Sequence, residues 1–362
     1  MPWPSNETAR LRGPDHRSEA VFTSIAHRAT AADRGESDLR ADISAMIESG
    51  LLARLTRACQ PGGDTLAASD TLRALGRANL SVGRLVEGHV NAIRLIRLYG
   101  EPAQKSDADE AVLHGVWGAD ADPPVRIVVR TGKEVWLIGR KKFCSGLGLV
   151  GRAVVTAATG DDDAPQMVLI DATDPHRASL GSWQVSGMRA TKSGSYDLSD
   201  HRAILLGQPG DFLREPHFEG GIWRYLALQT GGLEALVEGV RRMLGARAAH
   251  PLHAARLADL VIVAETARLW VESAALAIEA SRADARVVSR VLLARQAIDA
   301  ACQQAISLSE RSVGTAAFVE GGAIDRVRRD LAFFLRQADL DGKMMRAVAA
   351  ISTSEQVVGE MW

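Results

Sequence analysis

The sequence has few cysteines, and their placement argues against both a disulfide framework and a cysteine-based metal site. The three cysteines, Cys59, Cys144 and Cys302, lie far apart in a chain of 362 residues. An odd number of thiols with no metal-ligand spacing predicts reduced cysteines. His250 and His253 are three residues apart, but no third ligand accompanies them, so no metal site is expected.

The chain also lacks a strong charge of one sign and any long hydrophobic run. Its formal net charge is -1, so no basic surface for nucleic acid is expected. No apolar run approaches the roughly 20 residues of a membrane helix, so no membrane partner is expected either. The first 20 residues are polar and contain no signal-peptide core, which favours a cytoplasmic protein. Abundant alanine and arginine with little lysine favour a GC-rich bacterial source.

The rest of the composition is typical of a globular protein, 46% hydrophobic and 24% charged. The hydrophobic residues follow two different patterns along the chain. In the first hundred residues, apolar side chains recur at helical spacing, as at Ile43, Met46 and Ile47. From about residue 109 the pattern changes to short segments rich in β-branched residues, separated by Gly, Asp, Pro and Ser. These segments predict a compact antiparallel β-domain. They include 125–131, 135–143, 152–159, 166–173, 182–187 and 196–207.

The helical period returns after Pro216 and holds to the end of the chain. It predicts four long helices, at 219–244, 251–281, 285–314 and 322–353. The fold class is therefore α+β and mostly α. The expected domains are an N-terminal helical domain (1–108), a middle antiparallel β-barrel-like domain (109–213) and a C-terminal four-helix bundle (214–362).

The stretch KFCSGLG at 142–148 raises the first question of chemistry. No helix opens after its glycines, so a dinucleotide-binding loop is not predicted. Phe143 and Ser145 are two residues apart and would share one face of a strand, where they could contact a planar ring and its polar edge. The alternative is a bulge or turn between strands.

The order of domains and five motifs together resemble the acyl-CoA dehydrogenase superfamily, over about residues 40 to 340. The motifs are VWLIGRKKFCSG at 135–146, WQVSGMRATKSGSYDLSDHRAILLG at 183–207, RRMLG at 241–245, LAD at 257–259 and the pair Arg329-Asp330. The resemblance implies a flavin, FAD, between the β-domain and the bundle.

Several cofactor contacts are implied by this resemblance. Phe143 and Cys144 would line the flavin ring, Ser145 would hydrogen-bond its edge, and Gly146 would leave room for it. Backbone groups of a segment that contains Trp117 and Gly118 would contact the pyrimidine.

Other positions imply a cofactor shared between subunits, and hence a homodimer or homotetramer. Arg241 would reach the pyrophosphate of a neighbouring subunit's cofactor, unless it is a solvated surface arginine. Glu310 and Gly314 stand where the family has Q-x-x-G-G, under the partner's cofactor.

The catalytic base is missing from its usual place, nine residues after the arginine of Arg329-Asp330, where this chain has Ala338. Some members of the superfamily place the base at the start of the first bundle helix instead, where this chain has Trp223. Glu219, about one helical turn before Trp223, is the candidate base. The competing interpretation of Glu219 is a carboxylate that stabilises the start of that helix.

Three functions follow from the resemblance. The first is FAD-dependent α,β-dehydrogenation of an acyl thioester, with a separate flavoprotein as electron acceptor. The alternative is a flavin-dependent monooxygenase of the same superfamily, which takes reduced flavin from a flavin reductase and uses oxygen; Ser145-Gly146 fits that branch. A third interpretation is a degenerate, non-catalytic flavin-binding member.

Overall fold

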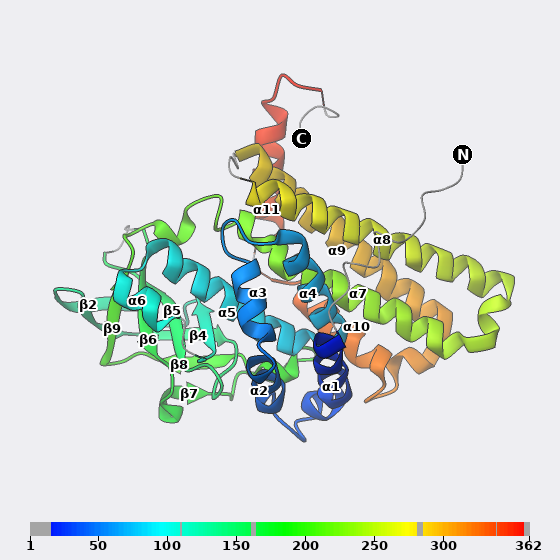
Figure 1. The fold of residues 1–362 in the computed structure, drawn as a ribbon, viewed down its shortest axis with the longest axis horizontal. Helices are drawn as coiled ribbons and strands as arrows, with labels where there is room; N and C mark the ends of the chain where they lie inside the picture. The colour runs from blue at the N-terminus through cyan, green and yellow to red at the C-terminus, as the bar shows by residue number, and fades with distance from the viewer. Residues whose placement is uncertain (1–15, 109–110, 161–163, 281–284, 338, 358–362) are drawn as a thin grey trace.

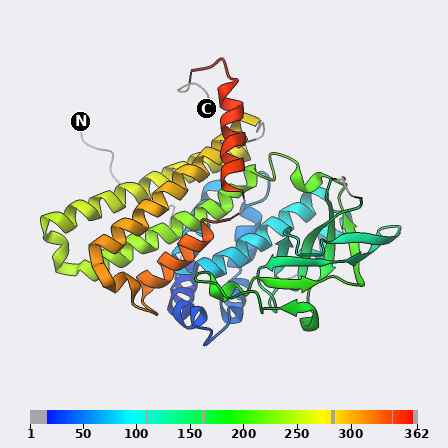
Figure 2. The same ribbon diagram turned by 180° about the vertical axis from the view of Figure 1, so that it is seen from behind.

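The computed structural model describes residues 16–108, 111–160, 164–280, 285–337 and 339–357 (Figure 1). The β-region lies at one end of the molecule, most of the N-terminal helices lie in the middle, and the C-terminal helices lie at the other end; Figure 2 shows the same arrangement from behind. The predicted mostly helical α+β fold class is confirmed. Within the described residues, no helix combines the length and the apolar character that crossing a membrane would require.

The N-terminal region is entirely helical where it is described. Its longest helix, α5, is buried over most of its length and begins at the cap Asn79, whose side chain accepts from the Ser81 amide at 2.9 Å. The helices are α1 (His16–Asp33), α2 (Arg40–Glu48), α3 (Leu51–Ala58), α4 (Thr65–Ala78), α5 (Leu80–Tyr99) and α6 (Pro102–Asp107).

The β-region forms two sheets. Six strands follow the order β1-β5-β6-β9-β3-β2, and three follow the order β4-β8-β7. All pairs are antiparallel except β1 with β5, which run parallel. The predicted strand at 182–187 is wrong, because this segment is a loop. The strands are β1 (His114–Trp117), β2 (Arg126–Thr131), β3 (Glu134–Ile138), β4 (Arg140–Cys144), β5 (Arg152–Ala157), β6 (Gln166–Asp171), β7 (Ala178–Ser179), β8 (Gly194–Asp197) and β9 (His201–Leu206).

The C-terminal region begins with three long antiparallel helices close to the predicted ranges: α7 (Trp223–Leu244), α8 (Pro251–Glu279) and α9 (Ala285–Val313). The predicted single helix at 322–353 is wrong. It is divided into α10 (Ala323–Phe334) and α11 (Leu340–Ser352), and Figure 2 shows α11 standing out from the bundle. Asp339 adopts a left-handed φ of 58° and caps α11 by accepting from the Gly342 amide at 3.2 Å, so the chain turns there.

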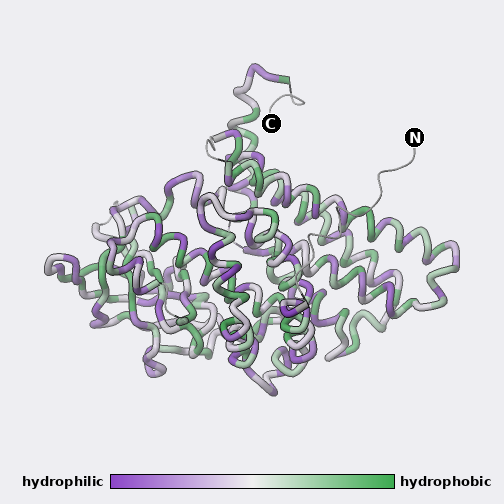
Figure 3. The backbone as a smooth tube through the Cα atoms, in the orientation of Figure 1, coloured by the Kyte–Doolittle hydropathy of each residue, from purple (hydrophilic) through white to green (hydrophobic). Residues whose placement is uncertain are grey.

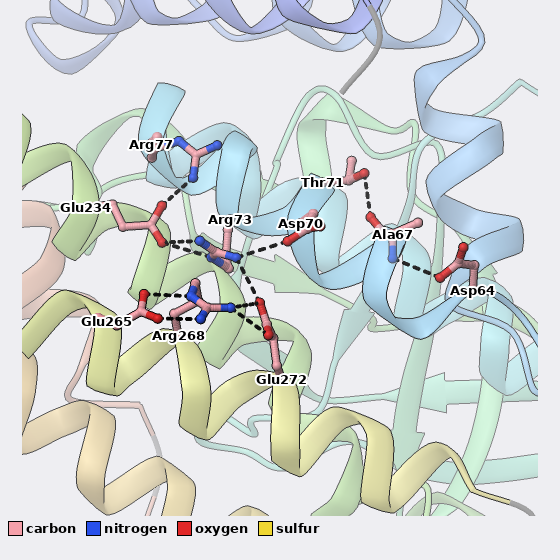
Figure 4. A network of polar contacts seen from close by, with 10 residues as sticks. All are labelled: Asp64, Ala67, Asp70, Thr71, Arg73, Arg77, Glu234, Glu265, Arg268 and Glu272. Atoms are coloured by element: carbon pink, nitrogen blue, oxygen red, sulfur yellow. Dashed lines mark hydrogen bonds and ion pairs between the residues drawn. The ribbon is translucent and has the colours of Figure 1, made fainter. Parts of the chain in front are cut away.

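An ion-pair network fastens the N-terminal helices to the bundle (Figure 4). Arg73 of α4 contacts Glu234 of α7 at 2.6 Å and Glu272 of α8 at 3.3 Å. The helices also cross closely, because a Cβ on Gly231 of α7 would lie 2.1 Å from the Arg73 carbonyl oxygen. The sequence GG at 231–232 therefore permits the close helix approach.

Candidate active site

A cavity of about 500 Å³ lies where the end of β4, the loop before β8 and the end of α10 meet. Its described walls combine aromatic rings with hydroxyl groups. Trp183 packs edge-to-face against Phe333, with ring centroids 5.5 Å apart. The lining residues are Arg84, Ala119, Phe143, Ser145, Trp183, Met188, Thr191, Ser193, Phe333, Phe334, Arg336 and Gln337.

The end of β4 is shaped by a bulge at Phe143. Pairing with β8 shifts register between Lys142 and Cys144, and Phe143 takes a left-handed φ of 57°. A non-glycine residue seldom adopts this conformation, and bulges of this kind re-aim a side chain at a sheet edge. The Phe143 ring is consequently 59% exposed and borders the cavity, as does Ser145.

A short chain of hydroxyl groups runs along the cavity wall. The Ser193 hydroxyl donates to Ser145 Oγ at 2.9 Å and lies 2.8 Å from Thr191 Oγ1. Thr191 itself donates to the Met188 carbonyl oxygen at 2.8 Å. Because Ser145 accepts from Ser193, its own hydroxyl hydrogen is left to donate to a group in the cavity.

Helix α10 holds the loop that carries these hydroxyls. Asp330 Oδ1 accepts from the Met188 amide at 2.6 Å, and Arg329 donates to the Ser186 carbonyl at 2.7 Å. A Cβ on Gly187 would lie 2.1 Å from the Arg329 carbonyl oxygen, so only glycine fits between them. The G-M-R motif and the Arg-Asp pair, far apart in sequence, therefore meet at the cavity.

Burial raises the pKa of Asp330 to about 6, and Arg326 only partly offsets this. The folded state consequently favours protonated Asp330, a stabilisation that is complete below about pH 4 and is lost as the pH rises through 6. In the Asp330→Asn variant the side chain at this position is uncharged at every pH. We expect the free energy of unfolding of the unmodified protein, relative to this variant, to fall by up to about 3 kcal/mol between pH 4 and 7. Urea unfolding of both proteins at four pH values measures this relative free energy of unfolding. An increase of the relative free energy with pH would contradict the prediction.

The neighbours of Ser145 in the predicted flavin strand have other roles in the structure. Cys144 is fully buried, does not line the cavity, and has its pKa raised to about 12 by burial. Gly146 has a φ of 83°, and a Cβ there would lie 2.9 Å from Val150 and 3.3 Å from Leu85. A side chain at Gly146 would therefore meet Val150 and Leu85, and the flavin contacts predicted for Cys144 and Gly146 stay predictions.

Trp117 and Gly118 lie behind the cavity wall. Trp117 is buried and donates from its indole Nε1 to the Ser145 carbonyl at 3.2 Å, which supports the end of β4 from behind. The Gly118 carbonyl accepts from Lys141 Nζ at 3.2 Å and from Thr156 Oγ1 at 3.1 Å. The next residue, Ala119, is the one that borders the cavity.

The residues predicted to reach a neighbour's cofactor line no part of the cavity within this chain. Arg241 is exposed at the end of α7 and donates to Glu238 at 2.6 Å. Glu310 pairs with Arg328 at 3.5 Å. Gly314 has a φ of 63° with open space where a Cβ would lie. A role of these residues toward a second subunit stays a prediction.

Glu219, the predicted base, is buried and tied to α11. Arg346 donates to its carboxylate at 2.5 Å and 3.1 Å, and Lys343 lies 3.9 Å away. Glu219 does not line the cavity. These contacts give it a structural role as the anchor of α11, whereas its catalytic role stays a prediction. Ala338, at the usual base position, lies outside the described residues.

A second cavity of about 210 Å³ adjoins the first, and Arg84 and Gln337 lie in the walls of both. Its polar wall comes mainly from α5, where Arg84, Glu87, Asn91 and Arg94 follow one another at intervals of three and four residues. Sequence reasoning missed these residues because they form no motif. The available signal was this polar stripe on an otherwise apolar helix.

A larger groove of about 930 Å³ lies elsewhere, between α1, α4, α7 and α10. Its walls include Phe22, Ala74, Met243 and Ile324. It contains none of the residues of the 500 Å³ cavity. The 500 Å³ cavity is the candidate site because Ser145 lines it and the Arg329-Asp330 pair holds the loop that forms part of its wall.

No protein-family model matches the chain. A dibenzothiophene monooxygenase of Rhodococcus erythropolis is 28% identical over 234 residues, which span 58% of this chain and 56% of that protein. The chain thus matches little more than half the length of this curated relative.

Among solved structures, the FMN-bound dibenzothiophene monooxygenase of Paenibacillus sp. A11-2 is similar with a TM-score of 0.79 and 18% identity, over 92% of this chain and 96% of that one. Butyryl-CoA dehydrogenase of Megasphaera elsdenii is similar with a TM-score of 0.81 and 15% identity, over 97% and 100%. The resemblance seen in the sequence is confirmed: the chain has the fold of the acyl-CoA dehydrogenase superfamily.

Proposed function

We propose that the chain is a flavin-dependent monooxygenase that uses reduced flavin and oxygen. One observation carries the choice over a dehydrogenase: none of the described residues that line the 500 Å³ cavity is a carboxylate. A dehydrogenase needs a base beside the acidic carbon of its substrate. The similarity to two dibenzothiophene monooxygenases supports the same choice.

The residues of the cavity suit a flavin ring. Trp183, Phe143 and Phe333 offer aromatic and apolar surface to a planar group, and the Ser145 hydroxyl is placed to donate to its polar edge. A bound reduced flavin supplies the two electrons needed to put one atom of O₂ into a substrate and release the other as water. FAD is the predicted flavin, and FMN, bound by one of the similar structures, is the alternative.

The protein's own contribution would be binding, orientation and exclusion of water. The contacts of Ser193 with Thr191 and with Ser145 would hold the Ser145 hydroxyl in place at the cavity wall. The contact of Asp330 with the Met188 amide fixes the loop over the cavity. With no dinucleotide-binding loop in the sequence, we propose a separate flavin reductase as the source of electrons.

We also propose a homo-oligomer, either a dimer or a tetramer. Helix α8 exposes Ile262, Leu269 and Leu276, seven residues apart and hence on one face, with exposed fractions of 62%, 53% and 49%. Figure 3 shows hydrophobic and hydrophilic residues alternating along the helices of the bundle. Such a row on a surface helix favours burial against a second copy. Light scattering should give a mass of two or four times 38.8 kDa, and a mass of 38.8 kDa would contradict the proposal.

The reaction type is tested by two arms of one experiment. Protein loaded with FMN or FAD is mixed anaerobically with a panel of acyl-CoAs, and we expect the flavin absorbance to stay unchanged. The same protein is then supplied with a flavin reductase, NADH, oxygen-18 gas and a panel of small sulfur and nitrogen compounds. Mass spectrometry should find a product that has gained one labelled oxygen atom. Bleaching of the flavin by an acyl-CoA would contradict the proposal and restore the dehydrogenase interpretation.

A further inference from the structure

We infer that the 210 Å³ cavity beside the proposed flavin site binds the anionic group of the substrate, so that the substrate class is small molecules bearing an oxyanion. A carboxylate, sulfinate, sulfonate or phosphate group shares this chemistry. The inference rests on the proposed function for the position of the reacting atom. The anion site itself rests only on the residues around this cavity.

The first argument is the balance of charge. Three arginines, Arg84, Arg94 and Arg224, line the cavity. The carboxylates paired with them are Glu87, with Arg84, and Glu279, which contacts both of the others. Three cations thus face two anions. An uncompensated charge away from water is costly, so an entering anion would relieve that cost.

The second argument is that buried nitrogen atoms at this cavity have no hydrogen-bond partner. Arg94 is 5% exposed. It donates to the Cys59 carbonyl at 2.5 Å and to Glu279 at 2.8 Å, yet its Nε–H has no acceptor. His217, which also lines the cavity, has a buried Nδ1 without a partner, and this nitrogen is a donor in the tautomer that carries its proton there. Buried donors without acceptors are rare in folded proteins and point to a group that is bound in use.

The third argument is that the arginines are held rigidly. Arg224 is 3% exposed, donates from Nε to Asn91 Oδ1 at 2.6 Å and lies 3.5 Å from Glu279. Glu279 also accepts from the Trp223 indole at 3.0 Å. Burial is the main cause that lowers the pKa of His217, and the positive charge of Arg94 is the second. Arg224 and Arg214 also lower this pKa, whereas Glu279 raises it. A neutral histidine next to fixed guanidinium forks is a suitable partner for an oxyanion.

The position of this site relates it to the reaction. Because Arg84 and Gln337 lie in the walls of both cavities, a ligand anchored in the small cavity can extend toward the larger one. A volume of about 210 Å³ suits a small polar group and not a large ring system. The anion would thus act as a handle that places the oxidisable atom at the flavin.

The test measures anion binding by calorimetry on the full-length protein, with and without FMN. The probe is methanesulfonate, and its matched neutral control is dimethyl sulfone. We expect methanesulfonate to bind and dimethyl sulfone not to bind. Equal binding of the two probes, or binding of neither, would overturn the inference.

Two substitutions with opposite expected effects on methanesulfonate binding make the test more specific. Arg94→Gln should weaken methanesulfonate binding at least tenfold, and Glu279→Gln should strengthen it, because each changes the balance of charge in the opposite direction. Arg242→Gln, on the exposed end of α7, is the matched control and should have no effect. Weakening by both cavity variants, or by Arg242→Gln alone, would contradict the assignment. If Arg94→Gln does not fold, Arg94→Lys keeps the charge but not the fork and should still weaken binding.

Failure of this inference is separable from failure of the proposed function. A protein that binds flavin but no anion refutes the anion site alone. A protein that binds methanesulfonate without FMN, and never binds a flavin, refutes the flavin proposal alone.

Discussion

Replacing Ser145 with tryptophan is expected to lower flavin affinity about a hundredfold. The larger ring would fill part of the 500 Å³ cavity, and the hydroxyl at the end of the Ser193–Ser145 contact would be lost. Overfilling costs about 1–3 kcal/mol and the lost hydrogen bond about 1 kcal/mol, and 1.4 kcal/mol corresponds to tenfold in affinity. Quenching of flavin fluorescence during titration measures the change.

Two further variants separate the causes. Ser145→Ala removes only the hydroxyl, so we expect a loss of affinity of about fivefold. Ser199→Trp makes the same change of size at an exposed turn and should leave flavin affinity unaltered. A Ser145→Trp protein that folds and binds flavin as well as the unmodified protein would show that the flavin lies elsewhere.

Removing the charge of Arg329 is expected to have the largest effect on stability. Arg329 contacts Asp33 of α1 at 2.6 Å and Asp325 of α10 at 2.9 Å, and both aspartates are buried. Arg329→Gln would take the paired cation away from buried Asp33, whereas Asp325 would keep its contact with Arg328 at 3.1 Å. Breaking a buried ion pair in this way costs about 3–5 kcal/mol. Urea unfolding followed by circular dichroism should show a lower midpoint.

A surface ion pair is the control for Arg329. Arg242 pairs with Glu238, but its side chain is 76% exposed. Arg242→Gln should therefore cost less than about 1 kcal/mol. Because Arg329 also donates to the Ser186 carbonyl beside the cavity, Arg329→Gln should weaken flavin binding as well. Equal stabilities of the two variants would contradict the role given to Arg329.

Much of the architecture could be predicted from the sequence, because it rests on periodicity. Helices α7, α8 and α9 have long apolar repeats and lie close to their predicted ranges. The break between α10 and α11 was missed because the apolar period continues across it. The turn depends on the left-handed conformation of Asp339, a non-glycine residue that gives no signal in the sequence.

The site was only partly predictable. Phe143 and Ser145 can be singled out from the sequence because the strand pattern and the resemblance agree on them. Both border the cavity, and their flavin contacts stay predictions. The resemblance could not foresee that Cys144 faces the core or that Leu85 and Val150 fill the space beside Gly146, because those contacts depend on local packing. The arginines of α5 and α7 meet only in the folded chain, so no local motif marks them.

The measurement that tests the central claim most directly is hydrogen exchange of the protein with and without FMN, read peptide by peptide. If the 500 Å³ cavity holds the flavin, FMN should slow exchange at 143–146, 186–194 and 331–337, the segments that form its walls. Protection confined to α1, α4 and the end of α7, around the 930 Å³ groove, would contradict the account, as would the absence of any protection at saturating FMN.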